Sequence, residues 1–192
     1  MALLLRGVTH AAIGAAGVLL YEVLMMGEPE PEAAAMAMTV AVAGALLPDI
    51  DHPGSLVSRK ATLVLKGTRL GVWITAVVLL VMGLYVYWPL MGVGLFMFAV
   101  SLVPHRGVTH SLVGALAIGL LLWAFAGSHV VPFMIGYLLH LLADMFTGGV
   151  PLLWPRENRI AIMHAKTGGL VDYLCLFVSL GFVSYWVANR VI

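Results

Sequence analysis

Two acidic residues and a histidine lie close together in the segment LLPDIDHPGS, where prolines and a glycine break regular structure. They are Asp49, Asp51 and His52. Carboxylates this close repel each other unless one is protonated or a cation lies between them. Capping and turn formation would explain the same residues without a cation. We interpret the three residues as candidate metal ligands.

A second candidate pair lies in the segment HLLAD. His140 and Asp144 are four residues apart, so a helix places them on one face about one turn apart. The pair could chelate a cation, or Asp144 could orient His140 as a supporting partner, and an intrahelical hydrogen bond fits equally well. An aspartate near the end of an apolar helix is costly without a counter-charge, which favours a ligand role.

The pentapeptide RGVTH occurs twice, at residues 6–10 and 106–110, and each copy continues into a run of small and apolar residues. LLPD follows the first copy and ends at Asp49, whereas LLAD follows the second and ends at Asp144. We therefore predict two repeat units of about 6–52 and 106–147, each a helical hairpin with histidine at its entry and aspartate at its exit. The two hairpins should run in the same direction, related by an axis along the membrane normal.

Taken together, these motifs supply nitrogen and oxygen ligands in excess of what one ion needs. The candidate metal ligands are His10, Asp49, Asp51, His52, His105, His110, His140 and Asp144. Such a set suits zinc above all, with manganese or iron as alternatives, and could hold one divalent ion or two. The single Cys175 excludes a disulfide framework and a multi-cysteine zinc site. Because the sequence has no GxSxG motif and no P-loop, hydrolysis by metal-activated water is the enzymatic chemistry that remains.

The composition places these residues in a membrane. Of 192 residues, 62% are hydrophobic and only 10% are charged, far from the balance of a soluble domain. Apolar runs near 8–26, 33–47, 70–87, 89–103, 110–127, 130–146 and 170–188 predict about seven spans. We predict an all-α polytopic transmembrane bundle forming a single domain over residues 1–192. A net charge of +1 gives no reason to expect nucleic-acid binding.

Charge distribution predicts the orientation. Alternating spans gather the lysines and arginines on one side and leave only Arg190 opposite, so that side is predicted to be cytoplasmic, with the N-terminus, and the C-terminus external. The same threading places six histidines on the cytoplasmic side and His129 outside; the six are His10, His52, His105, His110, His140 and His164. The basic segment 55–69 is expected to lie along the inner interface or to form a solvated loop. The first apolar run could also be a signal peptide, but the repeat argues that it belongs to the fold.

Four motifs in order, THAAIG, LLPDIDHPGS, HRGVTHSL and HLLADMFTGGVPLLWP, resemble the YdjM-like family of LexA-regulated inner-membrane proteins, which are predicted metal-dependent hydrolases. The resemblance extends from Thr9 to about Asp172 and implies a multi-helix membrane protein with a metal site built from these motifs. The matching residues are Thr9, His10, Asp49, Asp51, His52, His105, Arg106, His110, His140 and Asp144. The family pattern has an acidic residue, usually glutamate, after the final TG-rich turn, where this chain has Asp172.

These observations favour a membrane-bound metal-dependent hydrolase that attacks a phosphoester or related bond at the cytoplasmic leaflet. Arg106 would stabilise the developing negative charge, and Asp51 or Asp172 would act as general base. The alternative role for Arg106 is that of a positively charged anchor on the cytoplasmic side. Because the site lies near the interface, a membrane lipid or lipid-linked molecule is the expected substrate. The alternatives are a metal-ion or proton transporter, and a structural protein whose metal only joins its helices. The sequence leaves the oligomeric state open.

Overall fold

The computed structural model describes residues 2–51, 69–102 and 107–190. In those ranges the chain forms seven α-helices and no β-strand, apart from an isolated antiparallel bridge between Val150 and Ile160. Four segments are long and apolar enough to cross a membrane: Gly7–Met26, Pro31–Asp49, Val130–Thr147 and Leu170–Arg190. The predicted all-α membrane fold is therefore confirmed.

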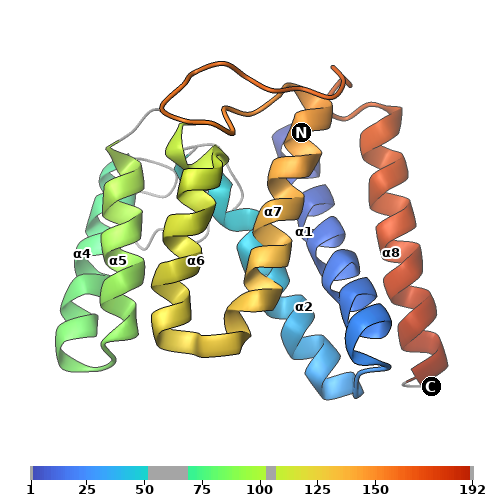
Figure 1. Ribbon diagram of the computed structural model, residues 1–192, viewed down its shortest axis with the longest axis horizontal. Coiled ribbons are helices and arrows are strands. Elements are labelled where there is room, and N and C mark those ends of the chain that lie inside the picture. Colours follow the sequence, from blue (N-terminus) through green and yellow to red (C-terminus); the bar gives the residue numbers. More distant parts are fainter. Residues whose placement is uncertain (1, 52–68, 103–106, 191–192) are drawn as a thin grey trace. The chain divides into compact units, whose positions relative to one another are not determined.

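The described helices group into two compact units, and the first consists of residues 1–47, 129–149 and 161–192. It contains α1 (Ala2–Tyr21), which continues into the π-helical turn η1 (Glu22–Met26), and α2 (Pro31–Leu46), α7 (Val130–Thr147) and α8 (Leu170–Arg190). Helix α1 packs against each of the other three, and α2 also packs against α7 (Figure 1).

Small residues allow the helices of the first unit to approach closely. A Cβ atom added to Gly136 of α7 would overlap the backbone carbonyl of Ala41 in α2, and one added to Gly44 of α2 would overlap the carbonyl of Phe133. At the same two turns of α2, a Cβ at Gly14 of α1 would lie only 2.8 Å from the Cβ of Ala45. Glycine and alanine at these positions are typical of membrane helices packed through their backbones. As a result, α1, α2 and α7 come together one turn from His10 and His140.

Helices α1 and α8 run side by side in the same direction (Figure 1). At one end, Trp186 of α8 packs with Leu19 of α1 and Ala34 of α2. Just beyond, Arg190 forms an ion pair with Glu28, in the turn that follows η1. The opposite end of the two helices carries His10 and the start of α8.

The second unit comprises residues 48–128 and 150–160. Its main elements are α4 (Arg69–Tyr85), α5 (Pro89–Ser101) and α6 (Leu112–Ala126), preceded by the 3-10 turns η2 (Leu47–Asp51) and η3 (Val108–His110), while η4 (Gly127–His129) leads towards α7. Helices α4 and α5 form a tight hairpin, in which the indole nitrogen of Trp73 donates a hydrogen bond of 2.6 Å to Ser101.

The helices of the second unit are shorter than the runs predicted for them. Helix α5 has 13 residues, which at about 1.5 Å per residue reaches about 20 Å, less than the hydrocarbon core of a bilayer. Of the predicted interfacial segment 55–69, only Arg69 lies within the described residues. The single-domain organisation and the parallel hairpin repeat stay predictions.

Candidate metal centre

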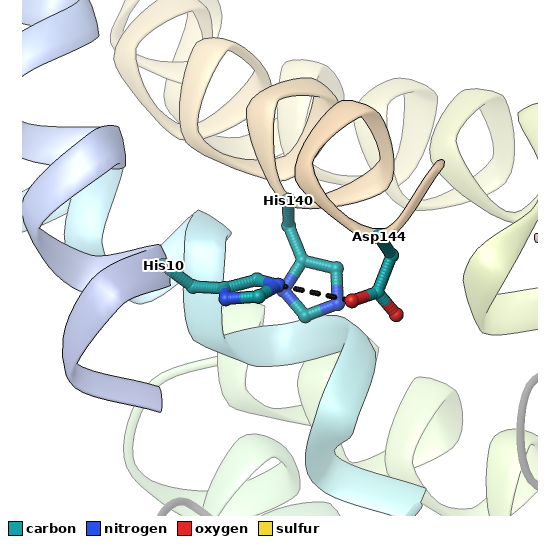
Figure 2. Close-up of side chains that lie close together, drawn as sticks. All are labelled: His10, His140 and Asp144. Carbon is teal, nitrogen blue, oxygen red and sulfur yellow. Dashed lines mark hydrogen bonds and ion pairs between the residues drawn. The ribbon is translucent and has the colours of Figure 1, made fainter. Parts of the chain in front are cut away.

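Two histidines and an aspartate from α1 and α7 converge inside the first unit (Figure 2). His10 projects from α1, and His140 and Asp144 project from adjacent turns of α7, as their four-residue spacing predicts. All three side chains are buried: His10 is 4% exposed, and His140 and Asp144 are each 1% exposed. Such burial of an ionisable group in a membrane helix requires partners that offset the loss of hydration.

The backbone of α2 determines how His140 presents its ring. Its Nδ1 lies 2.6 Å from the carbonyl oxygen of Ala45. Since a carbonyl only accepts hydrogen bonds, Nδ1 must carry a proton. In the neutral imidazole, Nε2 then holds a lone pair, which is the state in which histidine binds a metal. Histidine ligands in metalloproteins are commonly oriented by such a hydrogen bond from the second ring nitrogen.

His10 completes the cluster from the facing helix. Its Nε2 lies 3.3 Å from Oδ1 of Asp144, and the rings of His10 and His140 are 4.1 Å apart between centroids. Ligand atoms of all three residues lie within 4.8 Å of one another. Zinc ligands at 2.0–2.1 Å in a tetrahedron are about 3.3 Å apart, so the separation of His10 from Asp144 already fits a bound zinc. The same distance also fits a hydrogen bond between the two side chains.

A second histidine and aspartate pair lies in the second unit. Nε2 of His110 lies 3.5 Å from Oδ1 of Asp49, and the side chain of His110 is fully buried. Its Nδ1 is 3.0 Å from the hydroxyl oxygen of Thr109. His110 is therefore a buried histidine whose two ring nitrogens both have polar neighbours.

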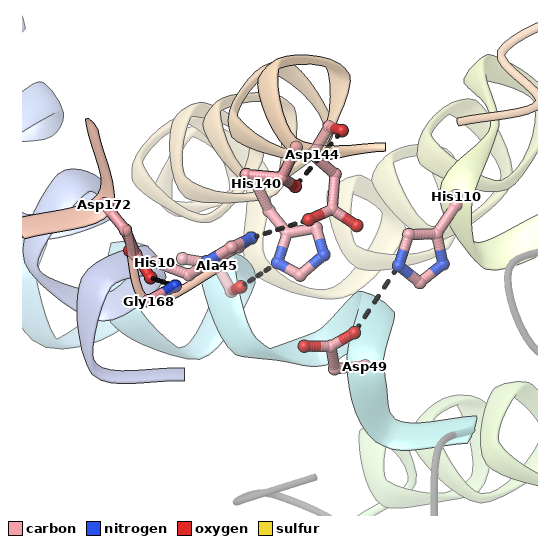
Figure 3. Close-up of polar contacts among 9 residues, drawn as sticks. His10, Ala45, Asp49, His110, His140, Asp144, Gly168 and Asp172 are labelled. Carbon is pink, nitrogen blue, oxygen red and sulfur yellow. Dashed lines mark hydrogen bonds and ion pairs between the residues drawn. The ribbon is translucent and has the colours of Figure 1, made fainter. Parts of the chain in front are cut away.

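The aspartate partners are exchanged between the two copies of the repeat. The repeat predicts that His10 with Asp49, and His110 with Asp144, are equivalent pairs that two hairpins bring to a shared site. The structure places His10 beside Asp144 and His110 beside Asp49 (Figure 3). Each histidine thus contacts the aspartate that belongs to the other copy of the motif.

The two RGVTH copies also differ in local conformation, because of the residue that follows them. In the first copy Ala11 follows, and Thr9 and His10 lie within the continuous helix α1. In the second, Ser111 follows and caps α6: its hydroxyl oxygen accepts a hydrogen bond of 3.1 Å from the amide of Gly114. An N-cap residue takes an extended backbone conformation, so the helix begins after Ser111 and the preceding Val108–His110 forms a 3-10 turn.

Asp172 lies in the first turn of α8, where one oxygen of its carboxylate accepts a hydrogen bond of 2.9 Å from the amide of Gly168 (Figure 3). This contact stabilises the start of the helix. Asp172 also lines a cavity of about 400 Å³ inside the first unit. His10 lines the same cavity, whose other walls include Thr9, Ile13, Phe146 and Thr147.

Several predicted site residues are not tested by these contacts. His52, His105 and Arg106 lie outside the described residues, and Asp51 is the last residue of η2. His164, predicted on the same side as the other histidines, is exposed and takes no part in the groups described above. His129 is the last residue of η4.

Two functional features were missed by sequence reasoning. The carbonyl of Ala45 orients His140, but every residue has a carbonyl, so nothing in the sequence marks this one. Thr109 beside His110 did have a signal, because the same threonine precedes the histidine in both RGVTH copies.

Comparison with known proteins relates the chain to one family of inner membrane proteins. The family model described as YdjM inner membrane protein matches residues 5–191. Inner membrane protein YdjM of Escherichia coli (strain K12) is 33% identical over 147 residues, covering 71% of this chain and 59% of the relative. The protein of the same name from Shigella flexneri matches to the same extent. The chain thus spans about three-fifths of the length of these curated relatives. No solved structure matches it. The chain belongs to the YdjM family of inner membrane proteins.

Proposed function

We propose that this protein is a metal-dependent hydrolase of the inner membrane, with a divalent ion, zinc above all, held by His10, His140 and Asp144. The observation that carries the proposal is the contact between Nδ1 of His140 and the carbonyl of Ala45. It leaves Nε2 of His140 as an acceptor in a buried site that also contains a second imidazole and a carboxylate.

The donor set fits zinc better than its alternatives. Two imidazoles and one carboxylate are the protein ligands of many catalytic zinc sites, which leave a fourth position for water or substrate. Magnesium and calcium prefer oxygen ligands, so a site with two nitrogen donors disfavours them. Asp49 and His110 are the corresponding candidates for a second ion.

A divalent ion bound there would supply Lewis-acid chemistry and activate water at neutral pH. The chain's own residues would orient the substrate and move protons. His10 is the proposed ligand that lines the cavity, so a phosphoester in the cavity would approach the metal ion past the ring of His10. Asp172 lines the same cavity and is positioned to accept a proton from water at that end. Arg106 and Asp51 keep the roles predicted from the sequence.

We assign the site to the cytoplasmic end of the helices by the positive-inside rule, with the N-terminus on that side and the C-terminus outside. Helices α1 and α8 run in the same direction, as they must when the ends of the chain lie on opposite sides. At this depth the accessible phosphoesters belong to lipids or lipid-linked molecules.

The proposal is tested by phosphate release in vesicles. Wild-type protein is reconstituted with zinc and a panel of lipid phosphoesters that includes phosphatidic acid and a polyprenyl phosphate. His140→Ala and Asp144→Asn should lose release, whereas the matched control His164→Ala should keep it, because His164 is exposed in the same unit. If the wild type holds zinc but releases no phosphate from any lipid, the hydrolase assignment is wrong.

If the protein binds zinc without hydrolysing lipids, one observation favours a structural role for the metal. The cluster joins three helices, since α1 and α7 supply side chains and α2 supplies the carbonyl of Ala45. A metal that only stabilises this junction would be retained without hydrolysis, and its removal would lower the stability of the protein.

A further inference from the structure

A groove continues from the histidine cluster along α1 and α8 towards the other end of the first unit. Beside the cavity of about 400 Å³ lies a second hollow of about 250 Å³. The two hollows share four lining residues: Ile13, Leu139, Val178 and Ser179. We call the combined feature the α1–α8 groove, with His10 and Asp172 at one end and Leu20 and Phe182 at the other.

The spacing of the lining residues explains why the groove is continuous. On α1, His10, Ile13, Gly17 and Leu20 lie at intervals of three and four residues, and therefore on one face. On α8, Asp172, Cys175, Ser179 and Phe182 repeat the same intervals. Two parallel helices with matching faces line a channel as long as the stretch they share. Ten residues at 1.5 Å each give a length of about 15 Å.

The groove is polar at one end and apolar along most of its length. Thr9, His10, Thr147 and Asp172 gather where it meets the cluster. Towards Phe182 the lining is apolar except for Ser179. Both helices are long and apolar enough to span a membrane, so the apolar end lies at the depth of the lipid chains.

The order of polar and apolar residues along the groove distinguishes between occupants. The polar residues lie at one end, and the apolar lining continues from them along the membrane-spanning helices. A lipid has the same order, a polar head followed by a hydrocarbon chain. A hydrocarbon chain is also much narrower than a transmembrane helix of a partner or a second copy, which is about 10 Å wide.

We propose that the α1–α8 groove seats the hydrocarbon chain of a phosphoester lipid, with its phosphate at the His10 and Asp172 end. The position of the phosphate rests on the proposed function, whereas the binding of the hydrocarbon chain in the groove does not. The substrate class thereby narrows to lipids with a long apolar chain, and water-soluble phosphoesters become poor substrates.

The test measures lipid retention by native mass spectrometry after detergent exchange, with dioleoyl phosphatidic acid as the probe. Ala16→Phe narrows the apolar end, because Ala16 lines the smaller hollow and does not line the cavity at His10. Ala35→Phe is the matched control, since Ala35 is exposed on α2 of the same unit. We expect one retained lipid per wild-type chain, a loss of at least tenfold in Ala16→Phe, and no change in Ala35→Phe. Equal retention in all three proteins, or none in the wild type, would overturn the proposal, as would a dimer that forms in place of the lipid complex.

A second measurement uses the unaltered chain and is decisive if Ala16→Phe does not fold. Cys175 lines the groove and is the only cysteine. Long-chain phosphatidic acid should slow its reaction with N-ethylmaleimide at least fivefold, and a short-chain analogue with the same phosphate should not. If both lipids protect Cys175 from modification equally, the groove does not bind the hydrocarbon chain.

The lipid-binding proposal for the groove and the proposed hydrolase function can be refuted separately. Asp144→Asn removes a metal ligand but not the groove, so it should retain the lipid while losing phosphate release. If the wild type retains the lipid and hydrolyses none, only the proposed function fails. If phosphate release does not depend on the length of the lipid's hydrocarbon chain, and Ala16→Phe does not change lipid retention, only the groove proposal is wrong.

Discussion

The closest contact between helix backbones near the cluster provides a quantitative test of how the fold supports the site. Gly136 lies one turn before His140 on α7, and a Cβ at this position would overlap the carbonyl of Ala41. In Gly136→Ala, the added Cβ would lie 1.9 Å from the carbonyl oxygen of Ala41, so α7 must retreat from α2 by roughly 1.5 Å to restore a normal contact. The backbone of α2 cannot yield as a flexible side chain would.

That retreat acts directly on the His140 contact. Adding roughly 1.5 Å to the 2.6 Å between Nδ1 and the Ala45 carbonyl gives about 4.1 Å, beyond the length of a hydrogen bond. Loss of such an orienting bond typically lowers metal affinity by about 10–100-fold. Overpacking costs about 1–3 kcal/mol, offset by about 0.5–1 kcal/mol gained on replacing a helical glycine. We expect a net loss of about 0.5–2 kcal/mol in the free energy of unfolding.

The assay combines zinc competition against a chromophoric chelator with unfolding in sodium dodecyl sulfate. Gly181→Ala is the matched control, because a Cβ at this α8 position meets nothing within 4 Å. It should keep the zinc affinity of the wild type and its stability or slightly more. The reasoning is refuted if Gly136→Ala binds zinc as tightly as Gly181→Ala and unfolds at the same detergent fraction.

Three further substitutions or treatments separate the roles of individual groups. Asp172→Ala should lower the free energy of unfolding by about 1 kcal/mol through loss of the contact to Gly168, while zinc affinity measured by competition stays unchanged. Ser111→Ala should remove the cap of α6 at a cost of about 1 kcal/mol, and hydrogen exchange should then become faster in residues 108–114; unchanged exchange there would contradict the capping role. Chelation should lower the stability of the wild type in detergent, whereas His140→Ala should respond little because it lacks a ligand; an equal response would place the stabilising metal elsewhere.

The main features of the fold follow from the sequence because they depend on composition and spacing. The apolar runs predict the seven helices, and the interval between His140 and Asp144 predicts their shared face on α7. The resemblance carried by the four motifs agrees with the family that the comparisons establish.

What the sequence could not supply depends on packing between distant segments. The repeat makes the His10 and Asp49 pair equivalent to the His110 and Asp144 pair, but it does not predict which aspartate each histidine contacts. His10 contacts Asp144 because tertiary packing selects the partner. The conformational difference between the RGVTH copies could have been predicted, because the second copy is followed by Ser111 where the first is followed by Ala11, and serine is a strong N-cap. The role of the Ala45 carbonyl was not readable, because it arises only when α2 and α7 meet.

X-ray absorption at the zinc edge, on the purified, zinc-loaded chain, tests whether His10, His140 and Asp144 hold a metal ion. We expect nitrogen and oxygen ligands at about 2.0–2.2 Å with imidazole scattering from two histidines. One imidazole should disappear in His140→Ala and none in His164→Ala. A first shell that contains sulfur, or a spectrum that His140→Ala leaves unchanged, would show that these three residues do not hold the ion.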